Sequence, residues 1–388
     1  MNNILELEPY GKQGWDSYWN KNNFKTTCLM PCSLGDKISK DKIPIHLIER
    51  RISYSEINKI ISFYFPKTKF FLPSRLAKHI KRIINSLILK KVINKIEKDK
   101  GIKFDIILLH YCYGTNTPYF LNKNKTFFYI HGTLSKTWLY KTTIKKAKTR
   151  IALMNENLIC CSKASYDDIK NLNMAPESLN FVLNGIPIST AKKMGMAKMP
   201  NKYGEEDYIV FFGRLSAEKQ IPQMIKAYVK SKIPAKFIIV GDGVEHQRTK
   251  ECIKDLNCGN NVILYGRDEN PYRWFKNAKF SIIFSSNEGA PRTIPESLAV
   301  GTPVIMSDQG GCKEYYRDCP ELQKYIIDYQ STDLLAIAIK EMYNNPPKID
   351  DKLQNQYSYE NHIDCLIEIF KDRDLIKDYK ERQKLRKK

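Results

Sequence analysis

Two carboxylates, Glu288 and Glu296, bracket a loop of small and polar residues that leads into a predicted helix. Pro295 suits the first turn of that helix, where its missing N–H is not needed. The backbone N–H groups around Thr293 would be unpaired at the helix start and would form an anion site. A favourable interaction with the helix dipole accounts for Glu296, but it gives no reason for Glu288 on the preceding loop.

A second group of charged residues follows an apolar, β-rich run at residues 208–212. Arg214 offers two parallel N–H donors and Lys219 a compact charge, and this combination suits a diphosphate. Two glycine turns, 241–243 and Gly266 followed by Arg267, also come directly after apolar runs. Glycines there let the backbone turn sharply or approach a ligand. Taken singly, solvated surface charges and ordinary turns explain each of these segments equally well.

The elements that must position these residues are short apolar strands alternating with helical periods, the pattern of a parallel sheet covered on both faces. Ligands bind at the carboxyl ends of such strands, where most of the segments above lie. In the second half of the chain the predicted strands are 208–212, 237–240, 262–265, 280–284 and 303–306. In the first half they are 3–7, 104–109, 126–130, 157–161 and 180–183.

These motifs, in this order and spacing, resemble the retaining glycosyltransferases of the GT-B fold, in particular glycosyltransferase family four (glycosyl transferases group 1). The match runs from about residue 208 to 304, with looser similarity over most of the rest. Its segments are G-R-L-x-x-E-K at 213–219, G-D-G at 241–243, E-x7-E at 288–296, A-x-G-T-P-V-I at 299–305 and N-G-I at 184–186. The resemblance implies an α/β protein with two facing Rossmann-like domains, parallel sheets and an intervening cleft.

We therefore expect an acceptor-side domain over residues 1–188 and a linker without helical periodicity over 189–207. A nucleotide-sugar-binding domain should span 208–350. Residues 351–388 should hold a helix that crosses back to the first domain and a basic tail.

Carried over position by position, the resemblance implies a donor site in the second domain. Arg214 and Lys219 would neutralise the donor diphosphate, and Glu288 would contact hydroxyls of the donor sugar. Glu296 would bind the ribose, and Arg267 would lie beside the base. The other implied donor-binding positions are Gly213, Gly241, Gly289, Ala290, Pro291, Arg292, Thr293 and Ile294.

Two positions in the first domain complete the implied site. His131, after the predicted strand 126–130, resembles the family's histidine that reaches the transferred sugar. Gly14 would lie in the loop that lets the acceptor side approach the diphosphate. A histidine at a strand end is as often a packing residue, and His110 ends another strand and is a second candidate contact.

Breaking a sugar–phosphate bond builds negative charge on the leaving diphosphate, and preorganised cations aimed at that charge are usually the largest catalytic contribution. Metal-using transferases typically hold their ion with a D-x-D pair, and the one match here, at 372–374, lies in the charged tail. We therefore expect no essential metal, with Arg214 and Lys219 in its place. With retention of configuration, the leaving phosphate could accept the acceptor's proton.

The predicted function is transfer of a hexosyl or N-acetylhexosaminyl group from a nucleoside-diphosphate sugar, preferably a UDP-sugar, to a glycan. The acceptor would be lipid-linked or of the lipopolysaccharide or capsule type. No cofactor beyond the nucleotide-sugar co-substrate is expected. The alternative is a sugar-nucleotide epimerase or another GT-B nucleotide-sugar enzyme without a glycan acceptor. An NAD enzyme is disfavoured, because the opening glycines Gly11 and Gly14 do not supply G-x-G-x-x-G.

The formal net charge of +22 favours polyanionic partners. Residues 72–100 read as a basic amphipathic helix, which suits an anionic membrane surface and equally an ordinary solvated helix. Residues 141–150 and 371–388 could extend that face. Nucleic acid is disfavoured, because no zinc-finger spacing or RNP-like segment occurs.

The compartment is expected to be the cytoplasm, with peripheral binding to the inner face of the cell membrane. The first residues lack a signal-peptide pattern, and no window has the length of apolar sequence that spans a bilayer. The ten cysteines contain no C-x-x-C pair, which favours reduced thiols over zinc ligands or disulfides.

Overall fold

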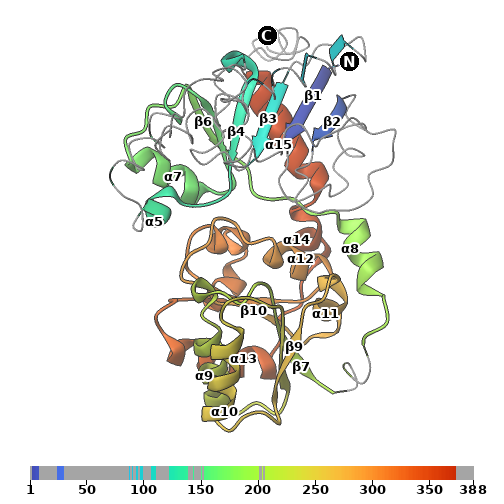
Figure 1. Ribbon diagram of the computed structural model, residues 1–388. Coiled ribbons are helices and arrows are strands. Elements are labelled where there is room, and N and C mark those ends of the chain that lie inside the picture. The colour runs from blue at the N-terminus through green and yellow to red at the C-terminus, as the bar shows by residue number, and fades with distance from the viewer. Residues whose placement is uncertain are drawn as a thin grey trace, which may run out of the picture.

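The computed structural model describes the strands 2–7 and 24–29 and residues 106–110, 122–138, 153–200 and 206–372, with single positions 87, 90, 93, 94, 97, 98, 143, 150 and 203. These residues form two α/β domains, one above the other in Figure 1, each built on a six-stranded sheet. The predicted α/β class and GT-B arrangement are confirmed. None of the helices in this described part is long and apolar enough to cross a bilayer.

The first sheet has the strand order β2-β1-β3-β4-β5-β6, and every pairing is parallel. All five residues of β4 are buried, as expected for a strand with both faces covered. The strands are β1 (Asn2–Leu7), β2 (Phe24–Leu29), β3 (Ile106–His110), β4 (Thr126–Ile130), β5 (Asn157–Cys160) and β6 (Ser178–Phe181). The described helices of this domain are η1 (Lys123–Lys125), α5 (Leu134–Trp138) and α7 (Lys163–Asn171).

The second sheet has the order β12-β11-β10-β7-β8-β9, again with parallel pairings only. Its strands are β7 (Tyr208–Phe212), β8 (Lys236–Val240), β9 (Val262–Gly266), β10 (Ser281–Ile283), β11 (Val304–Ser307) and β12 (Ile326–Ile327). Its helices are η2 (Ala217–Lys219), α9 (Ile221–Ser231), α10 (His246–Asp255), α11 (Pro271–Asn277), α12 (Thr293–Ala299), η3 (Cys312–Tyr316), η4 (Pro320–Tyr325), α13 (Thr332–Asn344) and α14 (Asp351–Gln356).

One expectation about the connection between the domains is wrong. The segment expected to be an aperiodic linker begins with a helix, α8 (Ile188–Gly195), which lies against the second domain near α12 (Figure 1). Its buried residues Ile188, Ala191 and Gly195 have helical spacing, and the helix packs on α11. A Cβ on Gly195 would come within 3.3 Å of the Val300 side chain, so there is little room for a larger residue at this position.

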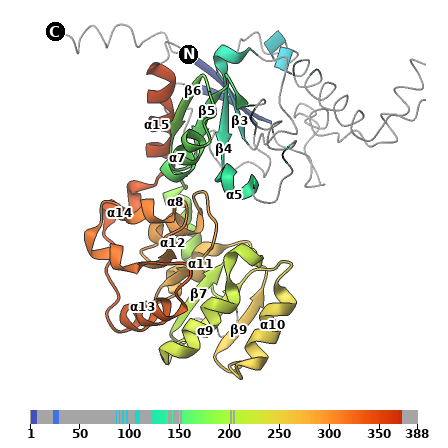
Figure 2. The ribbon, with the colours of Figure 1, turned by 90° about the vertical axis from the view of Figure 1, so that its left-hand side faces the viewer.

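The chain returns to the first domain through α15 (Tyr359–Asp372), which runs along the first sheet in Figure 2. Tyr359, Leu366 and Phe370 are fully buried in the same apolar cluster as Phe127 and Tyr129. The rings of Phe127 and Phe370 meet edge to face at 5.0 Å between centroids. Burial of each large apolar side chain contributes about 1.5–3 kcal/mol, so this helix anchors the second domain's end on the first.

Several sequence-based predictions lie outside the described residues. They concern Gly11 and Gly14, most of the basic segment 72–100, most of 141–150, and the tail beyond residue 372. The side chain of His110 is also outside them.

Candidate active site

The second sheet reverses its strand order between β7 and β10, because β8 lies on one side of β7 and β10 on the other. Ligands of open α/β sheets bind outside the carboxyl ends of the strands at such a reversal. The loops that leave these two strand ends are tied together, since the Ser286 N–H donates to the carbonyl of Glu218 at 2.8 Å. The charged motifs thus lie at the edge of the sheet where the topology predicts a ligand site.

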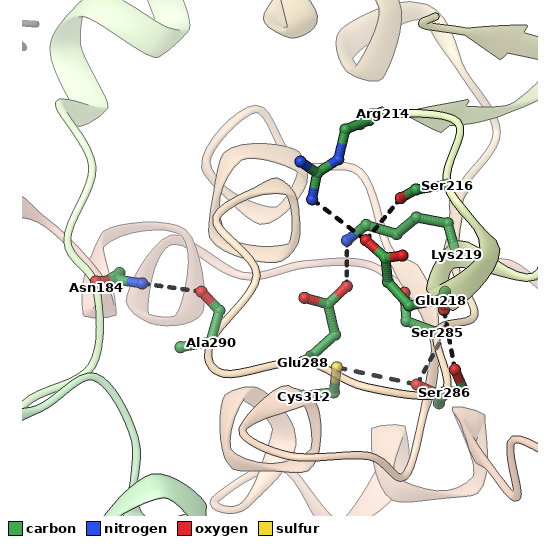
Figure 3. Close-up of polar contacts among 11 residues, drawn as sticks. Asn184, Arg214, Ser216, Glu218, Lys219, Ser285, Ser286, Glu288, Ala290 and Cys312 are labelled. Carbon is green, nitrogen blue, oxygen red and sulfur yellow. Dashed lines mark hydrogen bonds and ion pairs between the residues drawn. The ribbon is translucent and has the colours of Figure 1, made fainter. Parts of the chain in front are cut away.

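Lys219, after β7, and Glu288, after β10, form an ion pair at this reversal, and their side chains point toward one another in Figure 3. The two side chains are only 18% and 11% exposed. An ion pair with so little solvent around it is weakly screened. The sequence placed these residues in separate motifs, and the fold brings them into contact.

Arg214 lies at the same edge but is held differently. Its side chain is 73% exposed, and one guanidinium nitrogen lies 3.2 Å from Glu218. Glu218 also accepts a hydrogen bond from the Ser216 hydroxyl at 2.6 Å. Burial acts to raise the pKa of Glu218, but the Ser216 hydrogen bond and the nearby cations hold that pKa below its ordinary value. Arg214 is therefore a solvent-facing cation beside a more enclosed one.

The glycines predicted for this edge pack backbone against backbone. A Cβ on Gly241 would lie 1.8 Å from the carbonyl oxygen of Gly213, and one on Gly243 would lie 2.2 Å from that of Leu215. Gly241 also has φ +151°, and its N–H donates to Gly266 at 2.7 Å. Side chains at these positions would push apart the loops that carry Arg214 and Lys219.

Glu296 lies in the first turn of α12, enclosed by the protein. Its side chain is 13% exposed, and Arg292 lies 3.7 Å away. Burial raises the pKa of the Glu296 carboxyl, and the Arg292 guanidinium offsets this only in part. Arg292 also donates to the hydroxyl of Tyr359, the first residue of the crossing helix, at 3.4 Å. The remaining predicted loop positions lie between β10 and α12 or in that helix: Gly289, Ala290, Pro291, Thr293 and Ile294.

The carboxyl edge of the first sheet meets this loop. A Cβ on Gly289 would lie 2.5 Å from the carbonyl oxygen of His131, so the two backbones are in direct contact. Asn184, from the N-G-I turn, donates to the carbonyl of Ala290 at 2.8 Å (Figure 3). The His131 ring stacks at a tilt on Tyr129, with 4.7 Å between centroids. His131 therefore lies beside the Glu288 loop although it belongs to the other domain.

Three further residues link the domains, and no motif in the sequence singles them out. Thr133 donates to Asn287 at 3.1 Å, and Lys136 donates to the carbonyl of Ser286 at 2.9 Å. Glu314 accepts from backbone N–H groups at the start of α7. Their partners lie 150 or more residues away in the chain, so no local pattern marks them.

Arg267 lies apart from the cluster of Lys219, Glu288 and Arg214. It is exposed and follows β9, two strands from β7 at the edge of the sheet. Gly14 lies outside the described residues, and so does the side chain of His110.

Two Rossmann-type domains whose carboxyl edges meet around paired charges are the arrangement of the GT-B fold. Residues 196–362, which include the second domain, match the family described as Glycosyl transferases group 1.

Two curated relatives and one solved structure illustrate the similarity. The chain is 27% identical over 198 residues to an N-acetylgalactosamine-N,N'-diacetylbacillosaminyl-diphospho-undecaprenol 4-alpha-N-acetylgalactosaminyltransferase of Campylobacter jejuni, a match that spans about half of each protein (50% and 52%). It is 28% identical to an uncharacterized glycosyltransferase of Methanocaldococcus jannaschii, covering 83% of this chain and 86% of that one. A mutant of S. aureus TarM, solved with Fondaparinux, alpha-GlcNAc-glycerol and UDP, has a TM-score of 0.62 at 15% identity, covering 95% and 100% of the two chains, and shows the shared fold.

Proposed function

We propose that this protein transfers a hexosyl or N-acetylhexosaminyl group from a UDP-sugar to a lipid-linked or lipopolysaccharide-type glycan, with retention and without an essential metal. The observation that carries the proposal is the enclosed pair of Lys219 and Glu288 at the sheet reversal, with Arg214 beside it. One cation pairs with a carboxylate that is suited to sugar hydroxyls, and the other faces solvent. That set matches a diphosphate joined to a sugar.

In this mechanism the cations act on the leaving group. As the bond between the anomeric carbon and the diphosphate lengthens, negative charge grows on the phosphate oxygens. Lys219 and Arg214 stabilise that charge, and no metal is required for it. When the diphosphate takes over the Lys219 ammonium, the Glu288 carboxylate becomes free to accept hydrogen bonds from the sugar. Glu296, fixed on α12, accepts from the ribose hydroxyls.

The first domain supplies the face from which the acceptor arrives. His131 is placed beside the Glu288 loop by the contact of its backbone with Gly289, and its ring would contact the transferred sugar. The acceptor hydroxyl attacks from the side of the departing diphosphate, and a phosphate oxygen takes its proton. Gly14, which follows β1 in the sequence, would leave room for this approach.

The substrate classes rest on the relatives. The Campylobacter relative acts, by its name, on a diphospho-undecaprenol-linked sugar. A lipopolysaccharide 1,6-galactosyltransferase of Escherichia coli is 25% identical over 144 residues. The TarM structure contains UDP. A lipid-linked acceptor would draw the enzyme to an anionic membrane face, which its net charge of +22 favours.

The first test is thermal-shift binding against UDP, GDP, ADP and their common sugar conjugates. The variant Arg214→Ala/Lys219→Ala should lose the stabilisation that one carrier gives the wild type. The variant Lys230→Ala/Lys254→Ala is the matched control, since it removes the same charge from the ends of α9 and α10. Stabilisation of the wild type by no carrier would refute the proposal.

Product analysis separates the main proposal from the alternative. An epimerase would convert the sugar nucleotide without any acceptor, whereas a transferase should release UDP and form a new glycosidic bond. The anomeric configuration of the product, read by NMR, tests retention. An inverted product would contradict the same-face mechanism.

A further inference from the structure

The helix α5 follows His131 and carries a lysine, Lys136, toward the second domain. Its start is fixed by Asp168 of α7, whose carboxylate accepts from the N–H groups of Leu134 and Ser135 at 2.6 and 3.0 Å. Two charge-assisted hydrogen bonds at a helix start hold the helix firmly. Leu134, the first residue of α5, is fully buried. Lys136 therefore extends from a helix that is fixed at its start.

The Lys136 ammonium reaches two loops of the second domain at once. It donates to the carbonyl oxygen of Ser286, after β10, at 2.9 Å, and to the side-chain oxygen of Gln309, after β11, at 2.5 Å. Among the ion pairs within the described residues, none involves Lys136, so its half-buried charge is used on neutral oxygens. Such bonds are stronger than those of neutral donors.

The loop that it holds is the one that carries Glu288. Ser286 is held from both sides, because its N–H donates to Glu218 and its carbonyl accepts from Lys136. Beyond Glu288, the carbonyl of Gly289 accepts from Gly311 at 2.8 Å. A lysine of the first domain thus holds the loop two residues before Glu288, and it reaches this loop only when the domains are together.

We propose that Lys136 is a positioning residue that sets the Glu288 loop for the donor sugar when the two domains close. This inference rests on the proposed function. It means that the sugar, but not the nucleotide, is recognised only in the closed arrangement. UDP is bound by the second domain alone, and the additional affinity of a UDP-sugar requires Lys136.

A second link between the domains provides the control. Glu314 accepts from the N–H groups of Lys163 and Ala164, each at 2.9 Å, and so caps α7 across the domain interface. It is a charged contact of the same kind, but it does not bond to Ser286. Glu314→Gln weakens the apposition of the domains without removing the bond on the loop.

The experiment compares the full-length wild type with Lys136→Met, Lys136→Arg and Glu314→Gln. Amide hydrogen exchange over residues 285–289 reports the loop directly. Calorimetric titrations with UDP, UDP-glucose, UDP-galactose, UDP-GlcNAc and UDP-GalNAc report the affinity that the sugar adds to UDP. Thermal unfolding of each variant checks that it is folded.

Lys136→Met should speed loop exchange by about tenfold and abolish the added affinity of the best UDP-sugar, with the Kd of UDP changed by less than about twofold. Lys136→Arg should restore both, and Glu314→Gln should leave exchange over residues 285–289 near the wild-type rate. Unchanged exchange and unchanged sugar affinity in Lys136→Met would overturn the inference alone, as would an equal loosening of this loop by Glu314→Gln. A folded wild type that binds no member of the series overturns the proposed function as well.

Discussion

Both sheets have six parallel strands, but the strand order reverses at a different place in each. The second sheet reverses between β7 and β10, and the first between β1 and β3. At the second reversal the described loops carry the pair of Lys219 and Glu288. At the first, the residues that follow β1 and β3 lie outside the described part, and they include Gly14.

The described edge of the first sheet, at the end of β4, has a different chemistry. Thr133 and Lys136 donate to neutral oxygens of Asn287, Ser286 and Gln309 in the second domain, and the backbone of His131 touches Gly289. This contrast fits the proposal that the second domain supplies the charge that binds a donor. On that proposal, the edge of β4 positions the donor loop and presents the ring of His131.

The strongest challenge to this division of roles is His131→Ala. We expect turnover to fall by about a hundredfold, the scale of losing one group that contacts the reacting sugar, while the Kd of UDP stays the same. Steady-state kinetics and titration with UDP measure the two quantities. The turnover of His131→Asn, which keeps a polar side chain, should lie between those of the wild type and His131→Ala. If UDP binding weakens in parallel with turnover, the nucleotide site extends into the first domain and the contrast is wrong.

Glu288→Gln should have effects of opposite sign on binding and turnover. Glu288 competes with the diphosphate for Lys219 in the free protein, so its neutralisation should tighten UDP binding by about three- to tenfold, as for loss of one modest ion pair. Turnover should fall, because the sugar loses a charged acceptor.

Calorimetry with UDP tests this directly. Glu218→Gln is the matched control, since its partner Arg214 is largely exposed and solvent screens the pair. Equal tightening in both variants would show that a general change of charge is responsible.

Much of the fold could be predicted because its strands are short apolar runs, and most of those in the second sheet end at or next to glycine or serine. The predictions for β4 and β7 coincide with the observed strands, β8 and β9 differ by one residue at one end, and β11 is shifted by one residue. The strand β2 was missed, and β12 has only two residues. The helix α8 was missed because its buried face consists of Ile188, Ala191 and Gly195, too little apolar surface to show a period.

The residues of the site also fall into those that could be predicted from the sequence and those that could not. Motifs that are contiguous in sequence, such as the one containing Arg214 and Lys219, could be identified from residue types alone. Lys136 and Glu314 could not, because each acts on backbone or amide groups 150 or more positions away. Backbone groups carry no residue-specific signal, so only the packed domains reveal these contacts.

Glu296→Gln asks whether the charges at the second reversal serve the fold or the ligand. Burial raises the pKa of Glu296. A carboxyl with a raised folded-state pKa stabilises the fold below its unfolded pKa, near the ordinary value of 4.5, and this contribution is lost as pH rises through the folded-state pKa. The glutamine variant should therefore be more stable than the wild type by about 1 kcal/mol near neutral pH. The advantage should shrink towards pH 4.5.

Urea unfolding of the ligand-free protein at the two pH values measures this difference. Titration with UDP should show weaker binding by the variant. A loss of stability at neutral pH would mean that the ion pair with Arg292 outweighs the burial of the charge.

The smallest expected effect concerns Gln220, which directly follows Lys219 in a left-handed conformation, φ 49° and ψ 40°. Such a conformation costs a non-glycine residue roughly 1 kcal/mol, and glycine relieves it at some cost in unfolded-state entropy. The side-chain oxygen of Gln220 is buried, and no donor within the described residues reaches it. Gln220→Gly should thus stabilise the protein by about 0.5–1 kcal/mol. Lys232→Gly, at φ 54° on an exposed residue, should gain less, because it relieves only the backbone. If Gln220→Gly gains stability but weakens UDP binding, the strained backbone beside Lys219 helps to position the donor loop. The strain would then lower the stability of the fold while it favours binding of the ligand.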